Sequence, residues 1–376
     1  MTALRAGVIG LGTMGRHHLR VLRELPGVDL VGAADPSPAA RATVELDTVT
    51  ADIDELLALG LDLCVVAAPT LAHAEIGLRL ADAGIPALIE KPLAADSASC
   101  SKLAEEFEKR GLIGCVGHVE RYNMALLAMR HHLAHGELGP LFQVATRRQG
   151  PFSGRIRDVG VVMDLATHDI DLTCWVTGAS YLKVAAVTAC PSGRQHEDLV
   201  TVSGQLSDGI VTSHLVNWLS PMKERVVTIT GARGCLTADA LAGELWLRRN
   251  GADACVGPAG PLPHTAATGE VVRYLMPRRE PLRAELENFR DAILGRPASI
   301  VTMRQGAAAV AVAEAVIAAA RDGLAVMPDA AVAGHPLAYL PFVPAQLNGG
   351  SHAKAPGPQA PAVSDRTFAD WNGTSG

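Results

Sequence analysis

Three aspartates and a histidine lie between residues 164 and 171 of the otherwise apolar stretch DVGVVMDLATHDID. On a helix, Asp164, His168 and Asp171 fall at positions i, i+4 and i+7 and share one stripe. Asp169 then points elsewhere. On a strand, Asp164 and His168 would share a face and Asp171 would lie opposite. In both cases an imidazole and a carboxylate lie together among apolar side chains, which is costly unless they pair or take part in chemistry.

A glycine pattern follows the first expected strand, with Gly10, Gly12 and Gly15 spaced as Gly-x-Gly-x-x-Gly. Glycines there allow a tight turn, close approach of a pyrophosphate and packing of the helix on the strand. Asp35 ends the next expected strand 20 residues after Gly15, where a carboxylate binds the ribose hydroxyls of NAD and repels the 2′-phosphate of NADP. We therefore predict NAD, with Arg41 near enough to weaken the preference. The alternative is three turn glycines in an α/β protein without a cofactor.

The segment IEKP places Glu90 and Lys91 at the end of the fifth expected strand. Doubly wound folds bind ligands at the carboxyl edge of the sheet. A partly desolvated lysine beside a nicotinamide could polarise a substrate hydroxyl or exchange a proton with it. The alternative is a surface lysine in front of a proline that sets the exit angle of the chain.

Composition excludes several classes of function. The 376 residues are 48% hydrophobic and 19% charged, which suits a globular protein of two domains. A net charge of −6 makes nucleic acid or an anionic membrane an unexpected partner. No run reaches the roughly 18 apolar residues of a membrane helix, and the first residues do not suggest a signal peptide. Seven cysteines without a Cys-x-x-Cys pair favour reduced thiols in a cytoplasm.

Apolar β-branched runs alternate with helical patterns from RAGVIGLG to LIGCVGHV. Such strands are typical of a parallel, doubly wound sheet, so we predict an NAD-binding Rossmann domain over residues 1–120. Runs with hairpin spacing, such as LKVAAVTAC and IVTSHLVNW, then predict an α+β domain over residues 121–327 with a largely antiparallel, open-faced sheet. Residues 328–376 are rich in Pro, Ala and Gly and lack apolar periodicity, so we expect a mobile tail.

Four motifs, GVIGLGTMGRHH, AAPTLAH, EKP and DLATHDID, resemble in order those of the glucose-fructose oxidoreductase, inositol dehydrogenase and MocA (Gfo/Idh/MocA) family of NAD(P)-dependent oxidoreductases. The resemblance implies that Lys91, Asp164 and His168 surround the reacting carbinol. Family helices commonly have glycine two residues after the aspartate, where this chain has Ala166. The resemblance also implies these cofactor contacts: Gly10, Gly12, Thr13, Met14, Gly15, Asp35, Ala68, Pro69, Thr70, His73, Glu90 and Lys91.

Within that family, GHVERYN, VNWLSPMKERVVTITG and EPLRAELENF resemble the bacterial and archaeal UDP-N-acetylglucosamine 3-dehydrogenases. This implies oxidation of a secondary hydroxyl, at C3 of a nucleotide-linked hexose or hexosamine, to a ketone. An aminotransferase would then use the product in amino-sugar or aminoglycoside biosynthesis. Met124, where the subgroup usually has proline, and the long tail are departures. The alternatives are an inositol or free-sugar dehydrogenase and a non-catalytic dinucleotide-binding sensor.

Arginines gather just before the apolar stretch, in RRQGPFSGRIRD. Guanidinium groups bind diphosphates through two parallel hydrogen bonds, so we expect Arg148, Arg155 and Arg157 to contact the substrate. The alternative is a set of exposed loop arginines. Three further candidates for the sugar pocket follow the last parallel strand: Arg121, Tyr122 and Asn123. Simple packing explains Tyr122 equally well.

The expected chemistry couples a proton transfer to a hydride transfer. His168 accepts the carbinol proton while hydride passes to C4 of NAD+, Lys91 stabilises the alkoxide, and Asp164 orients the sugar or the imidazole. No metal is expected, because no further ligand cluster has suitable spacing. Asp171 is expected to hold the imidazole or to cap backbone, and Asp169 is not expected to be catalytic. We also expect a homo-oligomer, a dimer or tetramer formed through the open sheet face.

Overall fold

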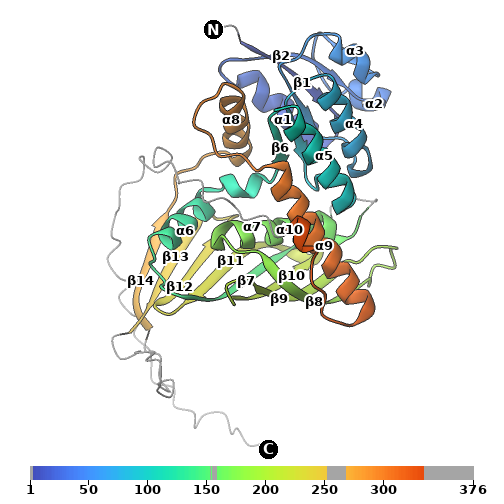
Figure 1. The fold of residues 1–376 in the computed structure, drawn as a ribbon. Helices are drawn as coiled ribbons and strands as arrows, with labels where there is room; N and C mark the ends of the chain where they lie inside the picture. Colours follow the sequence, from blue (N-terminus) through green and yellow to red (C-terminus); the bar gives the residue numbers. More distant parts are fainter. Residues whose placement is uncertain (1–2, 153, 155–158, 252–267, 334–376) are drawn as a thin grey trace, which may run out of the picture.

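Two β-sheets lie toward opposite ends of the molecule, with helices between and around them (Figure 1). The computed structural model describes residues 3–152, 154, 159–251 and 268–333. The first sheet has six parallel strands, and the second has eight strands that are mostly antiparallel. The expected α/β class, with a Rossmann sheet followed by an α+β domain, is confirmed.

The first sheet pairs its strands in the order β3-β2-β1-β4-β5-β6. The strands are β1 (Leu4–Ile9), β2 (Val28–Ala34), β3 (Val49–Thr50), β4 (Leu63–Val66), β5 (Ala87–Glu90) and β6 (Gly114–Gly117). The helices between them are α1 (Thr13–Glu24), α2 (Pro38–Arg41), α3 (Ile53–Leu57), α4 (Thr70–Asp82) and α5 (Ser97–Lys109). Every residue of β4 and β5 is buried, because helices cover both faces. The strand order reverses between β1 and β4, the point at which such sheets bind ligands.

The second sheet has the order β14-β13-β12-β11-β7-β10-β9-β8. Its strands are β7 (Leu141–Pro151), β8 (Tyr181–Ala189), β9 (Leu199–Leu206), β10 (Val211–Asn217), β11 (Leu219–Gly231), β12 (Gly234–Asp239), β13 (Glu244–Asn250) and β14 (Thr268–Leu275). Neighbours are antiparallel except β7 and β10, which run parallel. The parallel pair lies in the middle of the sheet, where β7 runs between β10 and β11.

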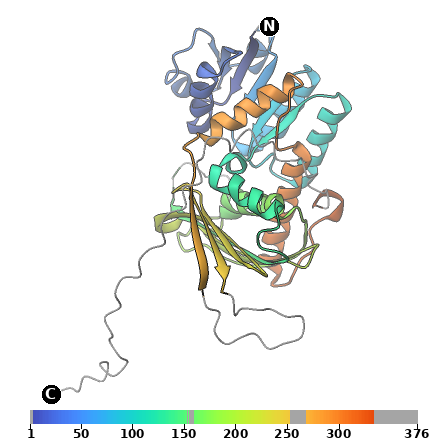
Figure 2. The same cartoon turned by 90° about the vertical axis from the view of Figure 1, so that its left-hand side faces the viewer.

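Helices cover the side of the second sheet that faces the first domain (Figure 2). Between the sheets the chain forms η1 (Val119–Tyr122), α6 (Met124–Ala134), the π-helical turn η2 (Val162–Ala166) and α7 (Thr167–Thr177). On β10, Thr212, His214 and Val216 are buried, whereas Val211 is exposed, as expected for a sheet with one covered face.

The last helices return to the first domain. Helix α8 (Pro281–Ile293) packs against α1 and η1, and its Leu282, Leu286 and Phe289 join the core formed by β1 and α1. Helix α9 (Met303–Asp322) packs against α5 and β8, and α10 (Ala330–Ala333) follows it. The expected division at residues 120 and 121 therefore assigns α8 to the second domain although it packs on the first.

Helix α9 is long and apolar enough to cross a membrane by length and composition alone. In the structure, 61% of its apolar window is buried inside the protein, as in the core helix of a globular domain. The residues beyond 333, which include most of the expected tail, lie outside the described residues.

Helix α8 carries a carboxyl group that is buried without a partner. Glu285 is 1% exposed, and neither of its carboxyl oxygens has a hydrogen-bond partner among the described residues. Burial, followed by the nearby negative charge of Glu90, raises the pKa of Glu285 well above its usual value. The native state therefore holds a proton that the unfolded chain releases above its ordinary pKa of about 4.3.

Glu285→Gln is expected to become more stable than the wild type as pH rises. The wild-type protein loses stability above the unfolded pKa of Glu285, by up to about 1.4 kcal/mol per pH unit, and the neutral amide does not. Urea unfolding midpoints between pH 4 and pH 8 measure the difference. Glu287→Gln on the same helix, which loses ion pairs to Arg279 and Arg283, is the control and shows no such gain. A stability difference independent of pH contradicts a protonated Glu285.

Candidate active site

The glycine loop between β1 and α1 has the geometry of a pyrophosphate site. Gly10 has a φ of +93°, and a Cβ there would lie 2.6 Å from the backbone of Ala67. A Cβ on Gly15 would lie 1.8 Å from the carbonyl oxygen of Gly10, so helix and strand pack closely. Around Gly12 the space is open to 4 Å, and no side chain caps the N-terminus of α1. The loop thus fits a diphosphate at a helix N-terminus.

Asp35 lies where β2 ends, beside this loop. Its carboxylate accepts the backbone N–H of Leu11 at 2.7 Å and that of Ser37 at 2.8 Å. The side chain of Arg41 donates to the carbonyl oxygens of Asp35 and Pro36 at 2.8 and 3.0 Å. Arg41 is therefore engaged by backbone beside Asp35, an arrangement that agrees with the expected preference for NAD.

The segment after β4 continues the same edge. Ala68, Pro69 and Thr70 lead into α4, whose N-terminus also lacks a side-chain cap. His73 is buried, and its ring nitrogens lie 2.9 Å from the carbonyl oxygen of Pro92 and 2.8 Å from that of Ala68. The imidazole thus ties the end of β4 to the segment that follows Lys91.

Lys91 connects the first domain to the helix of the second. Its Nζ donates to the Oδ1 of Asp164 at 2.9 Å and to the backbone oxygen of the same residue at 2.8 Å. Glu90 instead turns inward, where it accepts a hydrogen bond at 2.8 Å from Nε2 of His18. Burial would raise the pKa of Glu90, but His18 and Lys91 together bring it below its ordinary value. Lys91 and Asp164 are thus brought together as the motifs predicted, whereas Glu90 has a partner inside the domain.

The aspartate and the histidine of the opening stretch lie on a helix rather than a strand, but the helix is irregular. Asp164 lies in the π-helical turn η2, and His168 lies in the first turn of α7. The Thr167 hydroxyl donates to the carbonyl oxygen of Met163 at 3.0 Å. Single π-helical turns are rare and occur frequently at functional sites.

His168 is buried, and its surroundings disfavour the charged form of the imidazole. Burial, then the positive charges of Lys91 and Arg148, lowers the pKa of His168 well below its usual range. Its Nδ1 is buried and has no hydrogen-bond partner among the described residues. A neutral imidazole beside a lysine ammonium can accept a proton from a carbinol.

Among the described residues, the side chain of Asp171 makes no hydrogen bond to His168 or to backbone and pairs instead with Arg121. Its carboxylate accepts two hydrogen bonds from the side chain of Arg121, one of them at 2.8 Å. Arg121 also donates to Gln305 at 2.9 Å, so the guanidinium expected to bind the sugar is engaged inside the protein. Asp169 accepts a hydrogen bond from Arg148 at 3.1 Å.

The other candidates for substrate binding also have internal partners. Arg148 donates to Glu120 at 2.9 Å and to Asp169 at 3.1 Å, and it is almost fully buried. Tyr122 donates its hydroxyl to the carbonyl oxygen of Ser299, and Asn123 caps α6. The carboxylates that pair with Arg121 and Arg148 are buried, and no local sequence signal indicated them. Two further candidates, Arg155 and Arg157, lie outside the described residues.

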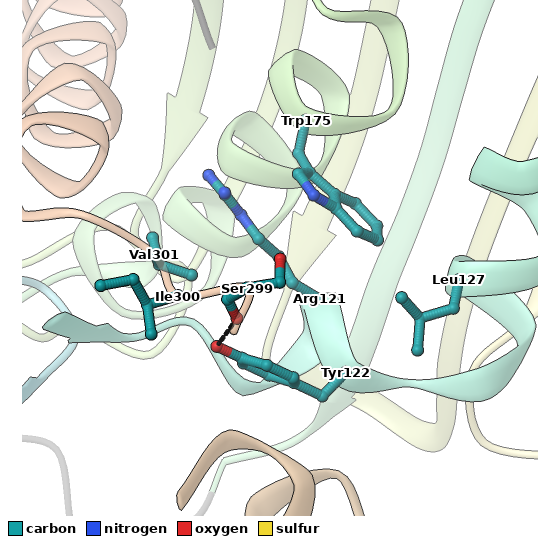
Figure 3. A pocket seen from close by; sticks show the side chains of 7 residues that line it. All are labelled: Arg121, Tyr122, Leu127, Trp175, Ser299, Ile300 and Val301. Carbon is teal, nitrogen blue, oxygen red and sulfur yellow. Dashed lines mark hydrogen bonds between the residues drawn. The ribbon is translucent and has the colours of Figure 1, made fainter. Parts of the chain in front are cut away.

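A small pocket lies beside the ring of Trp175 (Figure 3). Its lining residues are Arg121, Tyr122, Leu127, Trp175, Ser299, Ile300 and Val301. Lys91, Asp164 and His168 do not line it, so the pocket is separate from the proposed reacting groups.

One residue close to the site had no role in the sequence argument. His118, directly after β6, is buried with its ring edge-on to that of His168 at a centroid distance of 6.2 Å. Burial lowers the pKa of His118, although Asp171 lies 3.6 Å from its Nδ1. The motif GHVERYN was the available signal, because it places a histidine at the carboxyl edge of the sheet. In the part of the chain that the structure describes, no three His, Cys, Asp or Glu side chains are grouped to hold a metal ion.

Two models of one oxidoreductase family match the chain. The model of its NAD-binding Rossmann fold matches residues 4–118, and the model of its C-terminal alpha/beta domain matches residues 130–327. The chain belongs to the Gfo/Idh/MocA oxidoreductase family. The family predicted from the motifs and the NAD cofactor are thereby confirmed.

Several relatives have names that state a sugar or a polyol as the substrate. The UDP-N-acetylglucosamine 3-dehydrogenase of Acidithiobacillus ferrooxidans is 29% identical over 294 residues, which are 78% of this chain and 90% of that enzyme. Its solved structure has a TM-score of 0.74 at 26% identity, over 86% of this chain and 99% of that chain. Myo-inositol dehydrogenase Hyg17 of Streptomyces leeuwenhoekii is 33% identical over 55% of this chain and 66% of its own length. GenD2 from gentamicin A biosynthesis, solved with NAD, has a TM-score of 0.73 at 26% identity, over 88% of this chain and 97% of that chain.

Arg148→Gln is expected to lower the free energy of unfolding by about 3–5 kcal/mol, because it leaves the buried Asp169 without its cation and removes one of the two arginine partners of Glu120, the other being Arg225. Arg147→Gln is the matched control, since Arg147 is the next residue on β7 and is 58% exposed beside Glu224. It should change stability by at most about 1 kcal/mol. Denaturant unfolding of both variants tests this. An Arg148→Gln protein as stable as the wild type, with weakened binding of a nucleotide diphosphate, would restore the substrate role.

Proposed function

We propose that the chain oxidises a secondary hydroxyl of a sugar with NAD+, at C3 of a nucleotide-linked hexosamine such as UDP-N-acetylglucosamine. The product is a 3-keto sugar that a separate aminotransferase converts to an amino sugar. The observation that carries the proposal is the contact of the Lys91 ammonium with Asp164, one helical turn before the buried imidazole of His168, at the carboxyl edge of an NAD-binding sheet. The similarity to the UDP-N-acetylglucosamine 3-dehydrogenase, over 90% of that enzyme's length, supports the choice of substrate.

In the proposed mechanism, the glycine loop and Asp35 would hold NAD+, which when bound would supply the acceptor for the hydride of the carbinol carbon. The His168 imidazole takes the hydroxyl proton, which it can do because burial and Lys91 keep it uncharged. The Lys91 ammonium stabilises the negative charge that develops on the carbinol oxygen. Asp164 fixes Lys91 through both its side chain and its backbone oxygen, so the ammonium is in place before the substrate arrives.

One observation favours a second substrate class. Arg121 and Arg148 are held by Asp171, Glu120 and Asp169, which removes two cations expected for the sugar and the diphosphate. Inositols and aminoglycoside intermediates have no diphosphate and need no such cation. The similarity to an inositol dehydrogenase and to GenD2 agrees with this alternative.

The test is NADH absorbance with UDP-N-acetylglucosamine, UDP-glucose, inositols and aminoglycoside intermediates, with an aminotransferase added to consume the keto product. Turnover of UDP-N-acetylglucosamine supports the leading proposal. Turnover of inositol but of no UDP-sugar contradicts it and favours the second class. Binding of NAD without reduction by any of these compounds contradicts both and favours a dinucleotide sensor.

With the substrate so found, His168→Asn and Lys91→Met are each expected to lower kcat by about 10²–10⁴-fold, because they remove the proton acceptor and the cation at the oxyanion. For His168→Asn the dissociation constant for NAD should change little, and fluorescence titration measures it. Lys102→Met on α5 removes an exposed lysine and serves as the control. A His168→Asn enzyme within a few fold of the wild-type kcat rules out the assigned acceptor.

We further propose that the protein works in the cytoplasm as a dimer or tetramer, formed through the uncovered face of the second sheet. Exposed apolar side chains on its strands support this assembly. They are Phe142, Leu182, Val187, Val211, Met222, Val271 and Leu275.

A further inference from the structure

The helix that carries the proposed catalytic residues begins without a cap from its own sequence. Val161 precedes the π-helical turn, and no side chain of the helix bonds to its first backbone N–H groups. Those groups instead bind Glu197, in the segment between β8 and β9. The N–H of Val161 donates to the carbonyl oxygen of Glu197, and the N–H of Val162 donates to its Oε1, both at 3.0 Å. A carboxylate at a helix N-terminus is favourable for both hydrogen bonding and the helix dipole.

The neighbouring residue fixes Glu197 in place. Asp198 is fully buried, and its carboxylate accepts hydrogen bonds from the backbone N–H of Ser192 and the indole N–H of Trp218, both at 2.8 Å. Arg194 donates to the same carboxylate at 3.1 Å. The carboxylate of Asp198 accepts hydrogen bonds from these three groups. These bonds fix the backbone at Asp198 and so hold the preceding Glu197 at the N-terminus of the helix.

The same segment contacts the strand that leads into the arginine-rich loop. The guanidinium carbon of Arg194 lies 3.6 Å from the ring centroid of Phe152 and 4.5 Å from that of Trp218. Phe152 comes directly before residues 153–158 in the chain, and Val161 comes shortly after them. Residues 192–198 therefore contact the chain on both sides of the segment that contains Arg155 and Arg157.

Gly160 lies so close to the carboxylate of Glu197 that a side chain would not fit between them. A Cβ at Gly160 would lie 2.0 Å from Oε1 of Glu197, closer than any side chain tolerates. The carbonyl oxygen of Gly160 accepts the N–H of Asp164 at 3.0 Å, so the same glycine also begins the turn that holds the catalytic aspartate. The close approach is possible only because residue 160 has no side chain.

We propose that Glu197 is a positioning residue for the reaction, with Gly160 as its structural partner. By capping the π-helical turn, Glu197 fixes the backbone of Asp164, and both bonds from Lys91 end on that residue. A loosened cap lets Asp164 move, and the Lys91 ammonium moves with it relative to His168. This inference rests on the proposed dehydrogenase activity, and a displacement of about 1 Å in such a site can lower a rate by 10²-fold.

Four variants test the inference: Glu197→Ala, Glu197→Gln, Gly160→Ala and the Glu197→Ala/Gly160→Ala double variant. Glu197→Ala should lower kcat about tenfold with KM and NAD affinity changed less than threefold, because positioning and not binding is lost. Glu197→Gln should retain nearly full kcat, since its amide oxygen still accepts the Val162 N–H. Gly160→Ala should resemble Glu197→Ala, yet add little in the double variant, where the clashing carboxylate is gone.

Hydrogen exchange of the peptide over residues 159–168 gives a readout that needs no substrate. Exchange should become about fivefold faster in Glu197→Ala and stay unchanged in Glu197→Gln, as for the loss of one helix cap. Asp239→Ala is the matched control, because its carboxylate also accepts backbone N–H groups, those of Leu241 and Ala242, in a turn of the same sheet.

Three results overturn the inference, the first from hydrogen exchange alone and the other two from exchange combined with kinetics or from kinetics alone. The first is unchanged exchange in Glu197→Ala, which means that the cap does not hold the turn even if the enzyme has no activity on sugars. The other two are faster exchange with wild-type kcat and additive losses of kcat in the double variant, either of which means that the cap does not position the site. An enzyme that turns over none of the compounds defeats the proposed function separately, and the exchange data still decide on the cap.

Discussion

The contact between Lys91 and Asp164 is the interaction on which the rest of the site depends. Lys91 follows strand β5 of the first sheet, and Asp164 lies in the π-helical turn η2, which leads into α7. A largely buried ammonium requires a close anion, and Asp164 supplies a carboxylate at 2.9 Å and a backbone oxygen at 2.8 Å. This contact thus joins the two domains at the carboxyl edge of the first sheet.

Buried ion pairs hold the helix that carries His168, and the surroundings of this residue lower the pKa of its imidazole. Arg121 pairs with Asp171 and Arg148 pairs with Asp169, so two buried ion pairs connect α7 to η1 and β7. Their guanidinium groups cannot lose their charge. Burial and the cations Lys91 and Arg148 therefore all favour an uncharged imidazole. Arg121 and Arg148, which were expected to bind substrate, instead pair with buried carboxylates, and the charge of Arg148 also lowers the pKa of His168.

Local signals in the sequence predicted the sheet, the glycine loop and the edge position of Lys91. Gly10, Gly12 and Asp35 lie where their spacing indicated, because strand, turn and helix follow one another along the chain. The partners of Arg148 could not be predicted, since Glu120 and Asp169 come from separate elements that only the fold brings together. The packing of α8 on α1 and the cap from Glu197 escaped the sequence argument for the same reason.

The most direct test of this account is the titration of His168 by NMR in protein labelled with ¹³C-histidine, with His168→Asn used to assign the signal. The account predicts no titration step at or above the ordinary imidazole pKa of about 6.5 in the wild type. It also predicts that the step moves to higher pH in Lys91→Met, because a neighbouring cation is lost. A wild-type His168 that titrates at or above 6.5, or one that Lys91→Met leaves unchanged, contradicts the account.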